Sequence, residues 1–281
     1  MIVSAEGKIA GVMGWPVRHS LSPRVHGYWL RQHGIDGAYI PLPVRPEAFA
    51  GAIRALADVG FRGVNITVPH KTAAVAVCDQ VDGTARRIGA VNTVVFADGR
   101  LHGSNSDAYG FLENIRQGAP DWIAGAGPAV VLGAGGAARA VVAALADAGV
   151  PKVHVCNRSA ERAAALCREV GGPSAAVAWA DRASVLGEAA LLVNATSLGM
   201  AGQSPLTLDL ARLPAAALVT DLVYVPLETP LLAAARARGN RVVDGLGMLL
   251  HQARPGFAAW FGVFPDVTPD LRAFVLKQRA S

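Results

Sequence analysis

Cysteine is scarce in this chain of 281 residues, which contains only three. Cys78, Cys156 and Cys167 show no metal-ligand spacing, so we expect no metal site. An odd number of cysteines also argues against a disulfide framework, which is typical of small secreted domains in oxidising compartments. We therefore expect free thiols and a reducing, cytoplasmic location.

The chain also lacks an apolar run long enough to cross a membrane. Its most apolar region, residues 129–150, is interrupted by Gly133, Gly135, Gly136, Arg139 and Asp147, which makes a membrane span a poor interpretation. Residues 1–15 carry Glu6 and Lys8 where a signal peptide has its apolar core, and no basic segment precedes them. We therefore predict a soluble protein without a membrane partner.

Runs of basic residues are missing as well, although the formal charge is +5 and the sequence pI is near 9.4. The lysines and arginines are scattered, and no expected helix has a basic face with interleaved aromatic residues, as a nucleic-acid interface would require. The hydrophobic fraction of 52% is enough for one large or two ordinary globular domains. A small anionic substrate or cofactor fits this charge better than nucleic acid.

Strand and helix patterns alternate along the first hundred residues, which predicts a mostly parallel sheet. Residues 46–60 have the apolar spacing of an amphipathic helix, the strand "RGVNITV" follows, and Pro69 is predicted to open a helix with Lys71 in its first turn. The segments "VNTVVF" and "LHG" flank "ADGR", whose Asp-Gly pair predicts a hairpin. We expect this hairpin to end the first unit as an antiparallel edge.

A second alternating unit follows the loop "QGAPDWIAGAGP". Its predicted strands are "AVVL", "KVHVC", "ALLVNA", "ALVTDLVY" and "NRVVD", with helices between them, an order that indicates a doubly wound, Rossmann-like sheet. The chain is thus predicted to be a two-domain α/β protein. The domain change is placed so that residues 1–107 form the first domain and residues 108–244 the second.

A glycine-rich turn joins the first strand and helix of the second unit. In "VVLGAGGAARA", Gly133, Gly135 and Ala138 form a G-x-G-x-x-A pattern at the helix start. This pattern permits a tight turn, a close approach of the backbone to a pyrophosphate, and close helix packing. Such turns also serve plain packing, but the strand and helix on either side favour dinucleotide binding. The predicted contacts come from the turn residues Gly133, Ala134, Gly135, Gly136 and Ala137.

The end of the next strand indicates which dinucleotide binds. An NAD enzyme usually has a carboxylate there, whereas this chain has "CNRSAER". Its donors and positive charges suit the 2′-phosphate of NADP through charge-assisted hydrogen bonds, and they come from Asn157, Arg158, Ser159 and Arg162. Solvated arginines are the alternative, which the helix macrodipole disfavours at a helix start.

Polar residues of the first unit cluster at predicted strand ends and turns, where parallel sheets place ligand sites. They are Ser20, Ser22, Asn65, Thr67, Lys71, Asn92, Asn105 and Asp107. Most have a structural alternative. Ser22 before Pro23 is typical of a helix N-cap, Asp107 would cap a helix beginning at Ala108, and a lysine such as Lys71 is often simply solvated.

Reduction of a ketone by a nicotinamide requires a proton donor as well as a hydride. Lys71 with Asp107 is a plausible pair for that task, with His19 and His26 as alternatives. The chain has no motif for a catalytic zinc and no Tyr-x-x-x-Lys arrangement. The residues alone leave the proton donor open.

Nine segments taken together resemble the shikimate dehydrogenase family, whose members use NADP. In chain order they are "GWPVRHSLSPRVH", "GVNITVPHK", "GAVNTV", "GSNSDAYG", "GAGGAARA", "NRS", "NATSLGM", "DLVYVPLETPLL" and "DGLGMLLHQA". The resemblance implies that residues 245–281 complete the first, substrate-binding domain and that residues 108–244 bind NADP(H). It also implies an active site in a cleft between the domains and leaves monomer and homodimer open.

The resemblance also assigns site residues. Ser20 and Ser22 match the pair that binds the substrate carboxylate, and Lys71 with Asp107 matches the catalytic pair. The other implied substrate contacts are Thr67, Asn92, Tyr224 and Gln252. The segment "NATSLGM" and two later residues would line the nicotinamide side of the cofactor, through Asn194, Thr196, Ser197, Met200, Val223 and Gly245. The implied reaction is reversible reduction of 3-dehydroshikimate to shikimate by NADPH.

Two departures from the family pattern and two rival interpretations remain. Gly27 stands where the family usually has asparagine, and Ser106 replaces the common threonine. A quinate/shikimate dehydrogenase using NAD is disfavoured by "NRSAER" and by the second serine of "SLSP", where quinate users tend to carry threonine. A catalytically silent paralogue that binds shikimate would be expected to have lost Lys71 or Asp107, and both are present.

Overall fold

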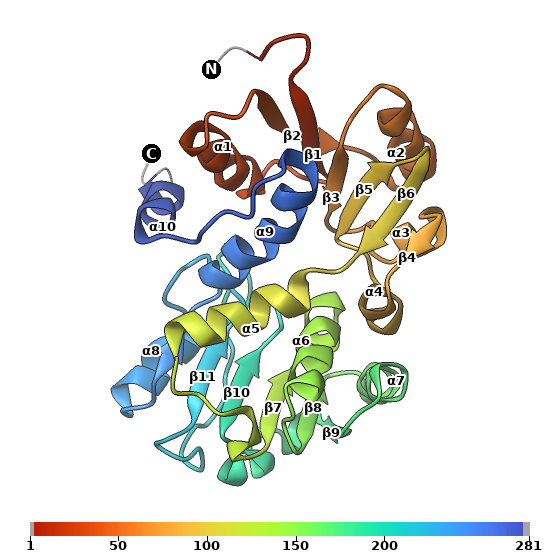
Figure 1. The fold of residues 1–281 in the computed structure, drawn as a ribbon. Coiled ribbons are helices and arrows are strands. Elements are labelled where there is room, and N and C mark those ends of the chain that lie inside the picture. The colour runs from red at the N-terminus through yellow and green to blue at the C-terminus, as the bar shows by residue number, and fades with distance from the viewer. Residues whose placement is uncertain (1–2, 278–281) are drawn as a thin grey trace. The chain divides into compact units, whose positions relative to one another are not determined.

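The computed structural model describes residues 3–277, which divide into two compact units (Figure 1). The first unit extends to Ser106 and resumes at Leu249, and the second comprises Asp107–Met248. The helix α9 (Leu246–Phe261) contains the point at which the chain returns to the first unit.

The first unit is built around a six-stranded sheet with the strand order β2-β1-β3-β5-β6-β4. Its helices, besides α9, are α1 (Ser22–Gln32), α2 (Phe49–Asp58), α3 (Ala73–Val77), α4 (Gly83–Ile88) and α10 (Pro269–Leu276). Its strands are β1 (Lys8–Gly14), β2 (Gly37–Pro43), β3 (Gly63–Ile66), β4 (Gln80–Val81), β5 (Thr93–Ala97) and β6 (Arg100–Ser104).

The predicted hairpin is β5 and β6, and its turn residues Asp98 and Gly99 both have positive φ, 52° and 69°. This agrees with the turn chemistry of an Asp-Gly pair. The prediction that the hairpin forms the edge was wrong, because β4 pairs with β6 in parallel and occupies that edge. A strand of two residues carries no period that a sequence pattern can reveal.

The other edge of this sheet is β2, and its side facing away from β1 carries two prolines. The amide of Lys8 donates to the carbonyl of Asp36, and the amide of Val44 donates to the carbonyl of Gly14. In a parallel pair, alternate residues bond to the same neighbour. The backbone N–H and C=O groups of even-numbered residues in β2 therefore point toward β1, and the backbone nitrogens of Pro41 and Pro43 point away from it. Proline is tolerated in such positions because it has no N–H to donate.

Aromatic rings from α1, β2 and α9 pack together in the core of this unit. The imidazole of His26 stacks on Tyr39 with ring centroids 3.8 Å apart and planes 2° apart, and Trp29 meets the imidazole edge-on at 5.8 Å. Phe257 and Trp260 of α9 complete the surroundings of the imidazole. Close aromatic packing of this kind fixes α9 against α1 and β2 within the unit.

The second unit is a doubly wound parallel sheet with the strand order β12-β11-β10-β7-β8-β9. Its strands are β7 (Ala129–Leu132), β8 (Val153–Asn157), β9 (Ser174–Ala178), β10 (Leu191–Asn194), β11 (Leu218–Asp221) and β12 (Val242–Val243). Its helices are α5 (Asp107–Gly118), α6 (Gly136–Asp147), α7 (Ala160–Val170) and α8 (Pro230–Ala237).

Counted within this unit, the strands follow the order 3-2-1-4-5-6 of a dinucleotide-binding fold. The order reverses between β7 and β10, and ligands of such sheets bind beyond the carboxyl ends of the strands at that point. All four residues of β7, β10 and β11 are buried, as expected for central parallel strands. The predicted α/β class and Rossmann-like second domain are therefore confirmed.

Short 3-10 turns fill several connections, at Pro46–Ala48 in the first unit and at Ala124–Ala126, Trp179–Asp181 and Ser184–Glu188 in the second. Among residues 3–277, the structure contains no helix that is both long enough and apolar enough to span a membrane.

Candidate active site

A network of buried amides lies at the carboxyl end of β3 in the first unit. The hydroxyl of Tyr39 donates to Oδ1 of Asn65 at 2.6 Å, which fixes the orientation of that amide. Nδ2 of Asn65 then donates to the carbonyl of Asn92 at 3.0 Å and lies 3.1 Å from Oγ1 of Thr93. Burial raises the pKa of Tyr39 well above its ordinary value, and a hydrogen bond with Ser22 opposes that rise.

The side chain of Asn92 is held by three donors. Its Oδ1 accepts from Oγ1 of Thr93 at 3.0 Å, from the amide of Ser106 at 2.9 Å and from Oγ of Ser106 at 3.2 Å. The same Oγ lies 2.8 Å from the carbonyl oxygen of Gln252 on α9. Ser106, which departs from the family's threonine, thus joins two predicted substrate contacts, because its amide donates to Asn92 and its hydroxyl donates to the carbonyl of Gln252.

Ser20 and Ser22 lie at the start of α1, and the expectation that Ser22 caps this helix was wrong. The N-cap residue is Leu21, already with helical dihedrals and without a side-chain cap, and Ser22 is the first helical residue. Oγ of Ser20 accepts from the amide of Ser22 at 3.3 Å. The hydroxyl of Ser22 is therefore not used by the helix terminus, and it contacts Tyr39 instead.

Thr67 and Lys71 lie in one turn after β3, and the prediction of a helix starting at Pro69 was wrong. Residues 68–72 form turns, and α3 begins only at Ala73. Tertiary contacts of His70 hold this segment: its Nε2 lies 2.7 Å from the carbonyl oxygen of Val44, and its ring stacks on Phe49 at 4.6 Å. The carbonyl of Lys71 accepts from the amide of Val91 at 2.9 Å, next to Asn92 in the chain.

Asp107 and Tyr224 belong to the second unit. Asp107 is the first residue of α5 and is buried, directly after Ser106 in the chain. The expected helix start at Ala108 is thus displaced by one residue, within the normal uncertainty of helix ends. Tyr224 is half-buried in the loop after β11.

The glycine turn between β7 and α6 has the shape that a pyrophosphate requires. Gly133 has a φ of 110°, and a Cβ there would lie 2.9 Å from the carbonyl oxygen of Ala195, so only glycine fits. Gly135 and Gly136 are exposed, and a Cβ on either would have no atom within 4 Å. Gly135 is the N-cap of the 12-residue helix α6 and provides no side-chain cap. The uncapped amides and open backbone fit a bound phosphate group.

The residues predicted to bind the 2′-phosphate surround the start of α7, directly after β8. Oγ of Ser159 accepts from the amide of Arg162 at 3.3 Å and caps the helix, and Nδ2 of Asn157 donates to the carbonyl of Ser159 at 3.0 Å. Arg158 and Arg162 are exposed. Within the described part of the chain, neither guanidinium takes part in an ion pair, so both positive charges face solvent.

The segment predicted to line the nicotinamide side follows β10. Asn194 and Thr196 are hydrogen-bonded to each other, Ser197 is exposed, and the side chain of Met200 is 38% exposed. Val223 is buried in the next loop, after β11. Gly245 has a packing reason of its own, because a Cβ there would lie 2.4 Å from the carbonyl oxygen of Leu222.

Sequence reasoning did not identify Tyr39 or Asp221 as residues that support the site. Asp221 is fully buried at the end of β11, where burial raises the pKa of its carboxyl and hydrogen bonds from Thr229, Val223 and Asn194 oppose that rise. An aspartate ending an apolar strand, eight residues before a Thr-Pro helix start, is the one signal that the sequence offers for it. Tyr39 has no such signal, since aromatic residues are common in strands.

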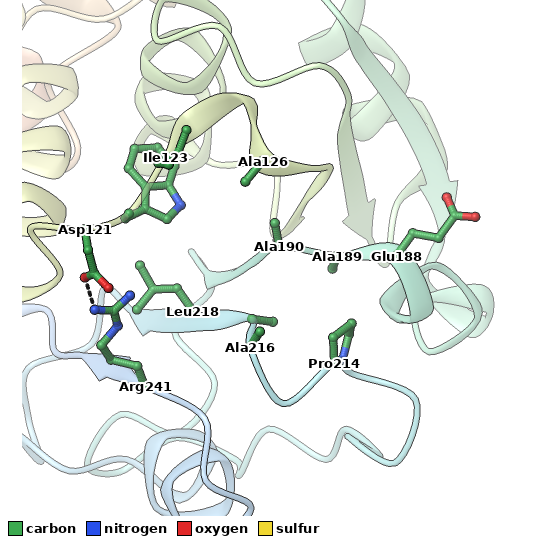
Figure 2. Close-up of a pocket in the computed structure, with 12 residues that line it drawn as sticks. Asp121, Ile123, Ala126, Glu188, Ala189, Ala190, Pro214, Ala216, Leu218 and Arg241 are labelled. Atoms are coloured by element: carbon green, nitrogen blue, oxygen red, sulfur yellow. Dashed lines mark hydrogen bonds and ion pairs between the residues drawn. The ribbon is translucent and has the colours of Figure 1, made fainter.

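A separate pocket of about 350 Å³ lies at the amino ends of β10 and β11 (Figure 2). Ile123, Leu218 and Pro214 line its apolar part, and the ion pair of Asp121 with Arg241 lies at its rim. None of the predicted site residues lines this pocket. It lies at the end of the sheet opposite the glycine turn, which follows the carboxyl end of β7.

Histidine, cysteine and acidic side chains do not cluster anywhere in residues 3–277 in a group of three or more that suits a metal ion. Cys78, Cys156 and Cys167 are free. Burial raises the pKa of the Cys78 thiol to about 11 and that of the Cys156 thiol to about 12. Such thiols are poor nucleophiles at neutral pH.

Comparison with known proteins agrees with this geometry. Residues 12–94 match the family model of the shikimate dehydrogenase substrate-binding domain, and residues 125–201 match that of shikimate/quinate 5-dehydrogenase. The NADP(+) shikimate dehydrogenase of Paramagnetospirillum magneticum is 63% identical over 98% of this chain and 100% of its own. The chain belongs to the shikimate dehydrogenase family. The NADP(+) shikimate dehydrogenase of Rhodospirillum rubrum is 60% identical over 98% of this chain and 99% of its own.

Solved structures of shikimate dehydrogenases and related enzymes share the whole fold. The Thermus thermophilus shikimate 5-dehydrogenase in complex with NADP(H) and shikimate is 42% identical, covers 96% of this chain and 99% of its own, and has a TM-score of 0.85. The quinate dehydrogenase of Corynebacterium glutamicum in complex with NAD is 33% identical, covers 96% of this chain and 99% of its own, and has a TM-score of 0.89. The prediction of the family is confirmed, and substrate and cofactor preference within the fold depend on individual residues.

Proposed function

We propose that the chain catalyses the reversible, NADPH-dependent reduction of 3-dehydroshikimate to shikimate. The observation that carries this proposal is the basic, carboxylate-free end of β8 in a member of the shikimate dehydrogenase family. Arg158 and Arg162 are exposed and outside any ion pair in the described residues, so they are available to a 2′-phosphate. A 63% identical relative over nearly the full chain supports the same assignment.

The cofactor would be held by two parts of the second unit. The uncapped amides of Gly135 and Gly136 would bind the pyrophosphate, and Asn157, Arg158, Ser159 and Arg162 would surround the 2′-phosphate. Thr196, Ser197, Met200, Val223 and Gly245 would line the nicotinamide side, and Gly133, Ala134 and Ala137 would shape the turn. NADPH supplies the hydride when it is bound.

The first unit would bind the substrate through the groups that its network holds in place. Ser20 and Ser22 would bind the carboxylate from the start of α1, where neither hydroxyl is used as a helix cap and that of Ser22 contacts Tyr39. Thr67, Asn92 and Gln252 would contact hydroxyl and keto oxygens, and so would Tyr224 of the second unit. The amide of Asn92 has its oxygen turned toward Ser106 and Thr93, which fixes its orientation before any substrate arrives.

Proton transfer would be the task of Lys71 and Asp107. Negative charge develops on the C3 oxygen during reduction, and the ammonium of Lys71 would donate the proton to it. Asp107 would orient that lysine and a substrate hydroxyl. The carbonyl of Lys71 accepts from the amide of Val91. Asp107 directly follows Ser106, whose amide donates to Oδ1 of Asn92. Hydrogen bonds therefore hold the backbone at Lys71 and next to Asp107.

The same proposal extends to the compartment and the partners of the enzyme. The three free cysteines suit a reducing compartment, and we place the enzyme in the cytoplasm. Its partners are small molecules, and it works as a monomer or a homodimer.

The proposal is tested by following nicotinamide absorbance with purified protein. Shikimate or quinate is supplied with NADP or NAD, in all four combinations. Fast turnover with shikimate and NADP alone is expected. Comparable turnover with quinate or NAD would instead assign the broader quinate/shikimate activity. Ligand binding without turnover in any combination would make the chain a catalytically silent relative.

Arg158→Ala is expected to raise the KM for NADPH by about 10- to 100-fold while the KM for NADH changes little, because a charge-assisted hydrogen bond contributes about 1.5–3 kcal/mol. Initial rates with each cofactor measure the two values. Arg168→Ala is a matched control, since Arg168 is an exposed arginine in the last turn of the same helix. Equal losses for NADPH and NADH would contradict the assignment of Arg158.

A further inference from the structure

We propose that Asp221 is a positioning residue for the cofactor. Its buried carboxylate ties the loop after β10 to the loop after β11 and so holds Thr196 and Val223 in place. The inference rests on the proposed function, because it concerns loops assigned there to the nicotinamide side of NADPH. Asp221 itself lies inside the second unit and is fully buried.

Three donors from three different segments converge on this carboxylate. Its Oδ1 accepts from Nδ2 of Asn194 at 2.9 Å and from the amide of Val223 at 2.9 Å, and its Oδ2 accepts from Oγ1 of Thr229 at 2.7 Å. Asn194 ends β10, Val223 lies in the loop after β11, and Thr229 begins α8. A buried carboxylate needs such compensation, so the three segments cannot separate without leaving it unpaired.

Asn194 passes the constraint on to Thr196. Nδ2 of Asn194 donates to Asp221 and lies 3.1 Å from the carbonyl oxygen of Leu198. Oδ1 of Asn194 accepts from the amide of Thr196 at 3.1 Å and from Oγ1 of Thr196 at 2.7 Å. Oγ1 of Thr196 in turn accepts from the amide of Leu198 at 3.1 Å. The bond to Asp221 fixes the orientation of the Asn194 side-chain amide, and that orientation places Oδ1 of Asn194 where it holds the loop after β10.

The loop held in this way packs against the glycine turn. A Cβ at Gly133 would lie 3.2 Å from Cγ2 of Thr196 and 2.9 Å from the carbonyl oxygen of Ala195. The strand order reverses between β7 and β10, where this contact occurs. A shift of the loop after β10 would therefore disturb the cofactor-binding end of the sheet, and the carboxylate of Asp221 prevents that shift although none of its own oxygens faces solvent.

The helix start at Thr229 allows a test with a matched control. Thr229 accepts from the amide of Leu232 at 3.3 Å in the sequence "TPLL", and Thr268 accepts from the amide of Leu271 at 3.2 Å in "TPDL". Each threonine is the N-cap of its helix, and a proline follows it as the first helical residue. Thr229→Val and Thr268→Val therefore remove equivalent caps, but only the first removes a donor to a buried carboxylate.

The measurement is the Kd of NADPH alone, by calorimetric titration of the full chain without substrate, together with KM and kcat for both reactants. Thr229→Val is expected to raise the Kd and KM for NADPH about tenfold while the KM for shikimate stays within about twofold. Thr268→Val is expected to leave the NADPH values unchanged. Thr229→Ser, which keeps the hydroxyl, is expected to restore tight binding.

Variants of Asp221 itself provide a second test. Asp221→Asn keeps an Oδ1 for the two amide donors and places its Nδ2 opposite Oγ1 of Thr229, which can accept. Asp221→Leu places a larger, apolar side chain there and loses all three bonds. The asparagine variant is therefore expected to bind NADPH more tightly than the leucine variant.

Two results would overturn the inference, and they are distinguishable. If wild-type protein binds NADPH but Thr229→Val binds it as tightly as Thr268→Val does, Asp221 has only a structural role. If wild-type protein does not bind NADPH at all, the proposed function fails first, and no cofactor loop exists for Asp221 to position. Tight binding by wild type and Thr229→Ser with weak binding by Thr229→Val supports the inference.

Discussion

Lys71→Ala is expected to lower kcat for shikimate oxidation and for the reverse reduction by about 10²- to 10⁴-fold, the range that a positioned general acid or base contributes. The KM for shikimate is expected to change little, because a group that acts mainly in the transition state adds little to ground-state binding. The turn should survive the substitution, since Lys71 anchors it through its backbone carbonyl, which accepts from Val91. Initial rates in both directions, at varied shikimate and NADP, measure the two constants.

Thr72→Ala is the control for this variant. Thr72 is the exposed next residue and makes no side-chain cap for α3, so its loss tests whether any disturbance of the turn slows the reaction. Its kcat is expected to remain near wild type. A large rise in KM with kcat intact at Lys71→Ala would instead make Lys71 a binding residue.

Acidification is expected to destabilise the first unit through His26. The ring is fully buried, and burial lowers its pKa from 6.5 to about 3. Between those values the unfolded chain binds a proton that the folded chain does not, so the free energy of unfolding falls as the pH falls from 6.5 toward 3 and is unaffected by His26 above 6.5. At about pH 4.5 the loss amounts to about 2–3 kcal/mol, from 1.36 kcal/mol per pH unit.

Urea unfolding of wild type and His26→Phe, at about pH 7.5 and about pH 4.5, isolates this contribution. The rings facing His26 from β2, α1 and α9 belong to Tyr39, Trp29, Phe257 and Trp260 and carry no charge in this range. The carboxyl groups of Asp36, Asp79 and Asp121 have lowered pKa values and add to acid destabilisation in both proteins. Parallel pH dependence of wild type and His26→Phe would contradict the prediction, and His26→Leu repeats the test without a second aromatic ring.

The second unit shows where sequence patterns suffice. Its central strands are continuous apolar runs, and the glycine turn after β7 has one structural context that explains its spacing, so element type and sheet class follow from the residues. The strand β9 escaped prediction because "SAAVA" is made mostly of small residues, and only one residue of it is a strong strand former. A strand at a sheet edge relies on its neighbour β8 rather than on its own preference.

The first unit shows why local rules fail near a site. Pro69 is a good first helical residue by local preference, yet His70 bonds to Val44 and stacks on Phe49, and these tertiary contacts keep Lys71 in a turn. Ser22 has the sequence of an N-cap, yet Leu21 occupies that position. In both places the departure from the local rule lies at, or within two residues of, a residue that we assign to the substrate, Lys71 in the first case and Ser22 in the second.

The amide networks were beyond the reach of sequence patterns for a different reason. Asn92 and Gln252 are joined through Ser106, and Asp221 collects donors from three segments. Hydrogen bonds between residues distant in sequence leave no period or spacing in the chain. The residues that a ligand would touch are predicted from the resemblance, whereas the side chains that hold them became visible only with the fold.

The two outward-facing prolines of β2 bear on how this protein behaves at high concentration. An open sheet edge is a template on which a strand of another molecule can pair, and repetition of that pairing leads to aggregates. Pro41 and Pro43 offer no N–H on that side, so an incoming strand would lose alternate bonds along the carboxyl half of β2. Strand-to-strand pairing of two copies along this half of β2 is therefore disfavoured. Replacing both prolines by valine would restore two outward N–H groups on β2, so we expect the variant to keep its fold and to aggregate more readily.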